Sequence, residues 1–169
     1  DLSTANTLIR METRTTHVLR GALAGLIAGA VFGITAATAG ILPNIAALVG
    51  STSAFVGFVV NLFVSVLVAV PFVAVFGRYA QRIGSGLTYG LAYGALWWVL
   101  GPLVLMPLIL GAPLPIASTE AIIASWPKLL MHLVYGGLLG LGYALLVPSD
   151  RQGPHHTQVY QETVEYRAA

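Results

Sequence analysis

Very few side chains in the long apolar stretches of this 169-residue sequence could take part in chemistry. His132 is the one group well inside such a stretch that can change charge near neutral pH. It could bind the metal of a haem or a pigment, or it could stay neutral and hydrogen-bond within the protein near Asn61. A haem held by two histidines would need a second one at the same depth, and His17 lies near the opposite membrane face. Paired histidine ligation is therefore excluded, and single ligation stays open.

Two adjacent tryptophans, Trp97 and Trp98, form the most distinctive local motif. They point about 100° apart on a helix and lie in the middle of a stretch, away from the interfaces where tryptophan is common. Pro102 and Pro107 lack the N–H groups that a helix uses, so we expect the helix to kink outward of Trp98. The rings either fill space opposite small residues or line a cleft for an apolar molecule. The candidate binding residues of such a cleft are His132, Trp97, Trp98 and Asn61.

The apolar stretches contain no charged residue in their interior, where pumps and ion-coupled transporters place one. The other polar groups there are a few threonines and the residues Ser65, Tyr89, Tyr93, Tyr135 and Tyr143. The chain has no cysteine, no Gly-rich phosphate loop, no zinc-ligand spacing and no Ser–His–Asp set. We therefore predict no catalytic residue, no metal site and no cofactor, and we exclude ion-coupled transport.

These side chains must be positioned by membrane-spanning helices. Only 8% of the residues are charged, 57% are hydrophobic, and the net charge of +2 is too small for a nucleic-acid-binding protein. Charge is absent from residues 21–77, 83–119 and 129–149, which provides room for four spans of about 20 residues. We predict an all-α integral membrane protein with a polar N-terminal segment 1–18, a transmembrane domain 19–148 and a polar cytoplasmic tail 149–169. The four transmembrane helices are predicted at about 19–40, 54–77, 86–110 and 126–147.

The basic residues predict the orientation of the spans. Only Lys128 lies on one side, and the other side carries Arg10, Arg14, Arg20, Arg78, Arg82, Arg151 and Arg167. This bias places both termini in the cytoplasm, for a multi-pass protein of the cytoplasmic (inner) membrane. The loops 41–53 and 111–125 then face outward. The apolar segment 45–49 and the helix-start pattern Ser118-Thr119-Glu120 predict a short interfacial helix in each loop.

The first and third spans resemble each other, which predicts an internal repeat. Gly21, Gly25 and Gly29 recur 65 positions later as Gly86, Gly90 and Gly94. Leu42-Pro43 recurs as Met106-Pro107, and Asn61 falls near His132 at a shift of 71. Because each unit has two spans, the second copy would enter from the same side, as a parallel helix-pair repeat about an axis along the membrane normal. The alternative is that Gly-rich apolar helices resemble one another by chance.

Glycines at four-residue spacing mark one face of three predicted helices, in the pattern of a glycine zipper. Lipid gives no hydrophobic drive for helix association, so faces without side chains let two backbones approach closely. These faces either pack within the bundle or hold a separate partner protein. The predicted helix-packing residues are Gly21, Gly25, Gly29, Gly33, Gly86, Gly90, Gly94, Gly136 and Gly140.

Two motifs resemble a group of small uncharacterised prokaryotic four-helix membrane proteins. They are Trp97-Trp98-Val99-Leu100-Gly101-Pro102, followed by Leu105-Met106-Pro107, and His132-Leu133-Val134-Tyr135-Gly136. The resemblance covers about residues 18–147 and implies four helices with a Gly-rich first one. In that group a histidine often stands where this chain has Asn61, which supports the repeat. The resemblance implies no activity.

The scarcity of reactive groups and the abundance of helix-packing surface predict a non-catalytic protein. We expect an accessory or assembly subunit of a larger membrane complex, whose partners are the lipid bilayer and other membrane-protein subunits or copies of itself, and not nucleic acid. The alternative is a binding or transport protein for a small apolar or neutral solute or cofactor, such as a quinone, a carotenoid or a pigment.

Overall fold

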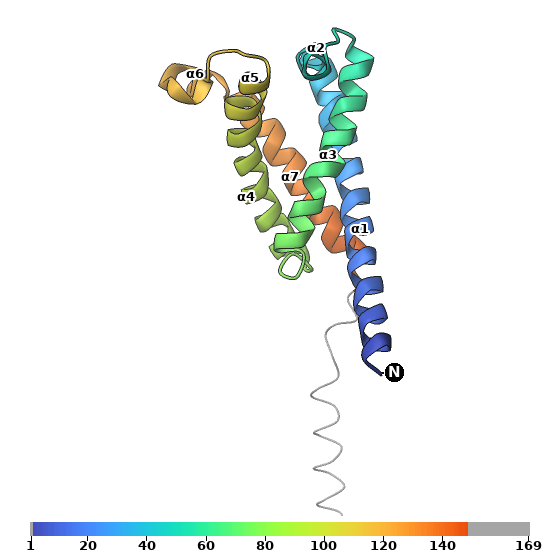
Figure 1. Ribbon diagram of the computed structural model, residues 1–169. Coiled ribbons are helices and arrows are strands. Elements are labelled where there is room, and N and C mark those ends of the chain that lie inside the picture. The colour runs from blue at the N-terminus through green and yellow to red at the C-terminus, as the bar shows by residue number, and fades with distance from the viewer. Residues whose placement is uncertain (1, 149–169) are drawn as a thin grey trace, which may run out of the picture.

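The computed structural model describes the backbone of residues 2–148 and the side chains of residues 14–148. Within this part every regular element is a helix, and four helices are long and apolar enough to cross a membrane. They cover Arg14–Thr38, Ala54–Phe76, Ile83–Ile109 and Trp126–Leu146 (Figure 1). Within the described residues, the predicted all-α fold with four helices able to span a membrane is confirmed, which suggests a multi-pass membrane protein. The predicted tail 149–169 lies outside the described residues.

The first helix, α1 (Leu2–Thr38), is longer than predicted. The sequence places its start near residue 19, whereas the helix already runs through the polar segment that precedes the span. The physical reason is that this segment contains no glycine or proline before Gly21, so nothing in it interrupts the backbone hydrogen bonds. Polarity changes within α1, but helicity does not.

The second and fourth spans, α3 (Ala54–Phe76) and α7 (Trp126–Leu146), begin and end within a residue of the predicted positions. Ser53 caps α3, and its side chain accepts a hydrogen bond of 3.5 Å from the Val56 N–H. Pro127 lies in the first turn of α7, where its missing N–H would have no helical partner.

The third span combines α4 (Ile83–Leu100), a π-helical segment η2 (Gly101–Leu105) and α5 (Met106–Ile109). In η2 the Met106 N–H bonds to the Gly101 carbonyl, five residues back. Pro102 has no N–H to offer, and a π-helical turn is one way for a helix to pass such a residue. The irregularity predicted after Trp98 therefore takes the form of a widened turn within a continuing helix.

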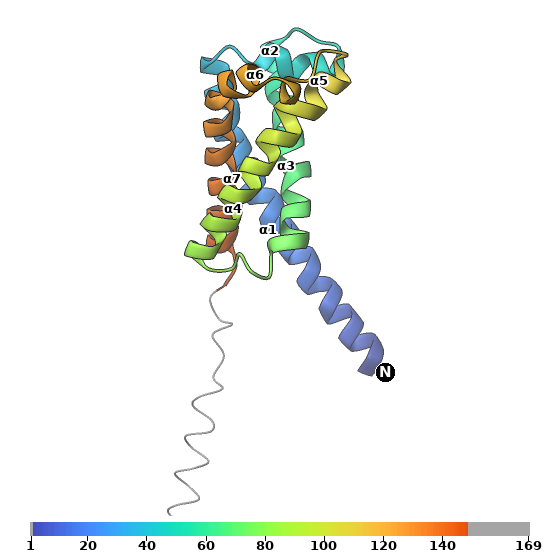
Figure 2. The ribbon, with the colours of Figure 1, turned by 90° about the vertical axis from the view of Figure 1, so that its left-hand side faces the viewer.

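Short helices lie in both segments that join the spans at one end of the molecule. Residues 39–53 contain α2 (Leu42–Ala46) and a 3₁₀ turn η1 (Ala47–Val49). Residues 110–125 contain a 3₁₀ turn η3 (Pro115–Ala117) and α6 (Thr119–Ala124), which Ser118 caps by accepting from the Ala121 N–H at 3.3 Å. Figure 2 shows these short helices gathered at the same end of the bundle, which we call the loop end.

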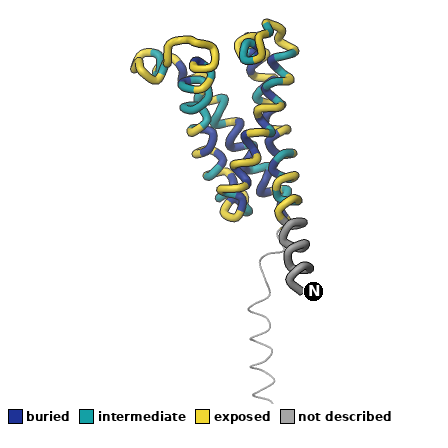
Figure 3. The backbone as a smooth tube through the Cα atoms, in the orientation of Figure 1, coloured by how far each residue is buried: buried dark blue, intermediate teal, exposed yellow. Residues whose placement is uncertain are grey.

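The long helices form two antiparallel pairs, α1 with α3 and α4 with α7. We call the end that carries Arg14, Arg20, Arg78 and Arg82 the arginine end. The pairs are joined through a core in the helix halves nearest this end, and they separate toward the loop end (Figure 1). Figure 3 shows buried residues along the middle of the bundle and exposed residues over much of the loop end. The largest side chains of this core are Phe72, Tyr93, Tyr135, Leu139 and Tyr143.

Candidate functional site

Three buried polar side chains of the spans donate hydrogen bonds to backbone carbonyls of a neighbouring helix. Asn61 Nδ2 donates to the Gly29 oxygen at 2.8 Å. Tyr93 and Tyr135 donate to the Val68 and Ser65 oxygens of α3 at 2.8 and 2.7 Å. A buried donor that has no water nearby needs such a partner, so each of these side chains links two helices. The donor atom of each of the three side chains therefore has a backbone partner.

In the α1/α3 pair, the glycine face of α1 lies against side chains of α3. A methyl group added at Gly21 would meet the Val73 side chain, and one added at Gly29 would meet the Ser65 side chain. At Gly25 it would meet the Ala69 Cβ and lie 2.9 Å from the Ser65 carbonyl oxygen. The contact is therefore formed by glycines on α1 and by residues with a Cβ atom, namely Ser65, Ala69 and Val73, on α3.

In the α4/α7 pair, glycines face glycines. A Cβ added at Gly90 would meet the Gly136 carbonyl, and one added at Gly136 would meet the Gly90 carbonyl. One turn away, Gly86 and Gly140 have the same reciprocal relation. The two backbones are therefore in direct contact, which is possible only where side chains are absent on both helices.

His132 lies half-buried on α7, near the loop end. Its Nδ1 lies 2.7 Å from the Lys128 carbonyl oxygen, one turn back on the same helix. A carbonyl can only accept, so the neutral ring carries its proton on Nδ1 and presents Nε2 as an acceptor. Nε2 points toward η2 of the third span, where a Cβ added at Gly101 would lie 3.7 Å from it. The ring also meets Phe32 of α1 edge-on, with centroids 5.3 Å apart.

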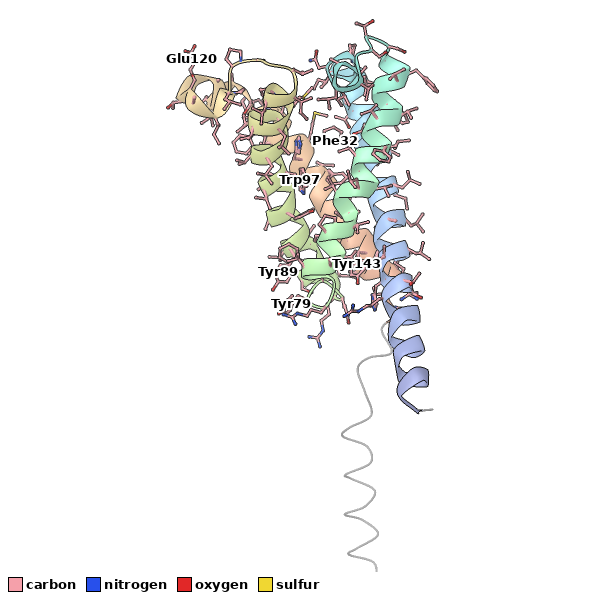
Figure 4. All side chains as sticks on the ribbon, in the orientation of Figure 1. Phe32, Tyr79, Tyr89, Trp97, Glu120 and Tyr143 are labelled. Atoms are coloured by element: carbon pink, nitrogen blue, oxygen red, sulfur yellow. The ribbon has the colours of Figure 1, made fainter. Side chains whose placement is uncertain are left out.

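The two tryptophans serve different contacts. Trp98 Nε1 donates to Ser125 Oγ at 3.1 Å, and Ser125 Oγ donates to the Ile122 carbonyl at 2.7 Å, so this ring ties the third span to the start of α7. Trp97 faces the space between the two helix pairs and meets the Tyr93 ring edge-on at 6.2 Å. Its Nε1 is buried and hydrogen-bonds to no described residue. Figure 4 shows Trp97 and Phe32 both directed into the space between the pairs.

The four residues proposed from sequence to share one cleft are distributed over three places. His132 and Trp97 lie in the part of the interface between the pairs that is nearer the loop end. Trp98 instead bonds to Ser125 at the α6–α7 junction. Asn61 is buried between α1 and α3 and bonds to Gly29, whereas the hydrogen bond of His132 goes to the Lys128 carbonyl. The reason is that each polar side chain lies within its own helix pair. Among the residues that the structure describes, no three or more His, Asp or Glu side chains are grouped for a metal ion.

Sequence reasoning missed an aromatic row that holds the two pairs together. Tyr89, Tyr93 and Trp97 are spaced four apart and therefore share one side of α4. Phe72 and Phe76 of α3 pack against this row, with Phe76 stacked on Tyr89 at 5.4 Å and Phe72 at 5.3 Å from Tyr93. The four-residue spacing of aromatics was the available signal.

A second contact missed by sequence reasoning lies at the arginine end. His17 Nδ1 lies 2.8 Å from the Tyr143 hydroxyl, which joins α1 to α7 over 126 residues of sequence. The two rings are 6.1 Å apart. No local pattern relates two residues so distant, so only the packing of the helices brings them together.

No protein-family model, curated protein or solved structure matches this chain. The resemblance to small four-helix membrane proteins therefore stays a prediction.

Proposed function

We propose that this chain is a non-catalytic multi-pass protein of the cytoplasmic membrane that acts by helix packing. It would serve as an accessory or assembly subunit of a larger membrane complex, or associate with copies of itself. The observation that carries the proposal is the use of the buried polar side chains. Asn61, Tyr93 and Tyr135 each donate to a backbone carbonyl of a neighbouring helix, so these buried polar groups serve the packing of the helices.

The test is co-purification in a mild detergent, followed by native mass spectrometry of the intact assembly. We expect a second subunit, or a second copy of the chain, at constant stoichiometry across detergents. Recovery as a monodisperse monomer under every mild condition would overturn the proposal.

We further propose that the two helix pairs are parallel repeats with both termini on the cytoplasmic side. The repeat is supported by the register of the contacts. Gly25 lies against Ser65 and Ala69, and their counterparts in the second pair are Gly90, Gly136 and Gly140 at the sequence shifts of 65 and 71. The orientation is supported by the arginines, and on this orientation the short helices α2 and α6 would lie at the outer membrane interface.

A second candidate function is the binding of a small apolar or neutral molecule between the helix pairs. It is favoured by the buried Trp97 Nε1, which makes no hydrogen bond of ordinary length and angle to a described residue, although the Tyr93 hydroxyl lies close enough to interact with it. His132 Nε2 offers an acceptor in the same part of the interface, and the Phe32 ring adds an apolar wall. A carbonyl or hydroxyl on an otherwise apolar ligand would satisfy the indole N–H.

The matched variants Trp97→Phe and Trp98→Phe test this second function. Both keep an aromatic ring and remove one indole N–H, but the Trp98 N–H already has Ser125 as its partner. If the Trp97 N–H binds a ligand, native mass spectra should show the ligand absent from Trp97→Phe and present in Trp98→Phe. An absorption spectrum of the purified protein identifies a coloured ligand. Equal ligand content in both variants would contradict this function.

A further inference from the structure

The arginine end gathers four cations from two separate parts of the chain. Arg14 and Arg20 lie on α1, and Arg78 and Arg82 lie in the short connection between α3 and α4. Two contacts place the start of the α1 span and the α3–α4 connection at the same height along the bundle. Gly21, next to Arg20, lies against Val73 in the last turn of α3. A Cβ added at Gly77, next to Arg78, would lie 2.9 Å from the Tyr143 hydroxyl, to which His17 is hydrogen-bonded.

These arginines have no carboxylate partner within residues 14–148. The one acidic side chain in that range is Glu120, which lies in α6 at the loop end. Arg14, Arg78 and Arg82 are exposed, and Arg20 is half-buried. Every basic residue of this end is arginine, whereas the loop end carries only Lys128 within the same range. Arginine presents a planar fork of N–H groups that matches the oxygens of a phosphate.

Arg78 is also held in place. Its guanidinium carbon lies 4.4 Å from the centroid of the Tyr79 ring, an arrangement that leaves the N–H groups at the edge of the fork free to bind. Tyr79 packs against Tyr89 at 5.9 Å, and Tyr89 stacks on Phe76 at 5.4 Å (Figure 4 labels Tyr79 and Tyr89). The cation thus sits at the end of an aromatic row that continues into the core, which lowers the entropy cost of binding an anion.

The neighbouring surface is apolar and suits an acyl chain. Ile83 and Leu87 on α4 and Val75 on α3 are exposed within the first turns on the membrane side of Arg78 and Arg82. A free phosphate would use only the guanidinium groups, whereas a phospholipid would use these groups and the apolar faces together. A patch of cations at the membrane boundary attracts anionic headgroups.

We propose that the arginine end is a binding site for the headgroup of an anionic phospholipid, held between Arg78 and Arg82 on one side and Arg14 and Arg20 on the other. The site needs only the membrane-spanning arrangement and not a partner subunit, so its failure would be distinguishable from failure of the proposed packing function. It selects lipid by the charge of the phosphate-bearing headgroup, and the acyl chains lie along α3 and α4.

The experiment is native mass spectrometry of the full chain from micelles that contain equal amounts of phosphatidylglycerol and phosphatidylcholine. We expect the wild type to retain phosphatidylglycerol preferentially. The double variant Arg78→Gln/Arg82→Gln is expected to reduce that retention at least tenfold, from about fivefold for each arginine at a membrane surface. The matched control Lys128→Gln removes one cation at the loop end and should leave retention unchanged. Equal retention of the two lipids, or equal losses in the double variant and the control, would overturn the proposal.

Two further arms separate charge, geometry and source of the phosphate. Arg78→Lys/Arg82→Lys keeps both charges and removes the forks, so retention should fall between wild type and the glutamine variant. An excess of inorganic phosphate, compared with chloride at equal ionic strength, should displace little phosphatidylglycerol. Complete displacement by inorganic phosphate would identify a simple anion site and overturn the lipid proposal. Because these side chains lie outside the core, the circular dichroism and the elution volume of the variants should match those of the wild type. Tyr79→Ala removes the ring beside Arg78 and keeps all charges, so it measures the contribution of the ring separately from that of charge.

Discussion

The two helix pairs are built on the same glycine spacing but differ in what the glycines meet. In α1/α3 the glycine face of α1 meets the side chains of Val73 and Ser65. In α4/α7 the glycines of both helices meet the opposite backbone, as at Gly90 and Gly136. At Gly21 the Val73 side chain can rotate away from an added methyl group, whereas a backbone carbonyl, as at Gly90, can move only with its helix. The same sequence pattern therefore predicts two very different tolerances to substitution.

The largest effect is expected from Gly90→Ala or Gly136→Ala. Each added Cβ would meet a carbonyl of the facing helix, so α4 and α7 must separate and lose their close contact along several turns. We expect a loss of about 3 kcal/mol in the free energy of unfolding. Reversible unfolding in mixed detergent and dodecyl sulfate micelles measures it.

Gly84→Ala is the control for this prediction, because a Cβ at Gly84 on α4 would meet nothing within 4 Å. Alanine there should leave stability unchanged or raise it through helix propensity. Comparable losses at Gly84 and Gly90 would show that the glycines matter for the single helix and not for the contact.

A smaller effect is expected from Asn61→Leu. The variant removes the hydrogen bond to the Gly29 carbonyl and should cost about 1.5 kcal/mol, near the upper end for a bond between membrane helices. Unfolding in the same micelles measures the loss. Asn61→His sharpens the comparison of the pairs, because His132 holds the corresponding position in the second pair. We expect it to keep stability within about 0.5 kcal/mol of the wild type, and a loss equal to that of Asn61→Leu would argue against the repeat.

Gly21→Ala should have a net cost of about 1 kcal/mol or less. The added methyl group meets the Val73 side chain, which can shift, and alanine regains part of the cost through its better helix propensity. Thermal unfolding in detergent compares this variant with Gly90→Ala. If the two variants lose equal stability, the contrast between the pairs is wrong.

The smallest effect is expected from Tyr135→Phe, which tests the connection between the pairs. It removes one hydrogen bond to the Ser65 carbonyl and keeps the ring, for a cost of about 0.6 kcal/mol. Tyr79→Phe is the control, since that exposed ring has no side-chain hydrogen bond among the described contacts. Identical unfolding curves for Tyr135→Phe and the wild type would show that this hydrogen bond adds nothing to the contact between the pairs.

Much of the fold could be predicted because membrane spans follow from local properties. Long runs without charge set the four spans, and the caps at Ser53 and Ser118 set helix starts within a few residues. The span predicted to begin near residue 19 lies within a longer helix, because hydropathy marks where lipid contact begins and not where helicity begins. Pro102 predicted an irregular turn after Trp98, but the choice of a π-helical turn depends on how the helix continues to pack.

Less of the candidate site could be predicted. The adjacent positions of Trp97 and Trp98 on a helix predict that the two rings point in different directions. They do not predict which ring meets Ser125 and which has a buried N–H. The sequence also could not tell that Asn61 bonds to the Gly29 carbonyl of α1 and that His132 bonds to the Lys128 carbonyl of its own helix. The contact between His17 and Tyr143 carries no local signal at all.

The sequence by itself determined that four helices can cross a membrane, which end carries the arginines and which helix faces are free of side chains. These properties depend on the chain's own residues and on the lipid or water around them, so spacing and composition are sufficient to set them. Only the tertiary structure decided which glycines meet a side chain across the contact and which meet another glycine. That choice depends on the residue across the contact, 44 to 46 positions away in sequence for the pairs Gly25–Ala69 and Gly90–Gly136. A helix carries information about its own faces, but its partner is selected by how closely two particular surfaces fit.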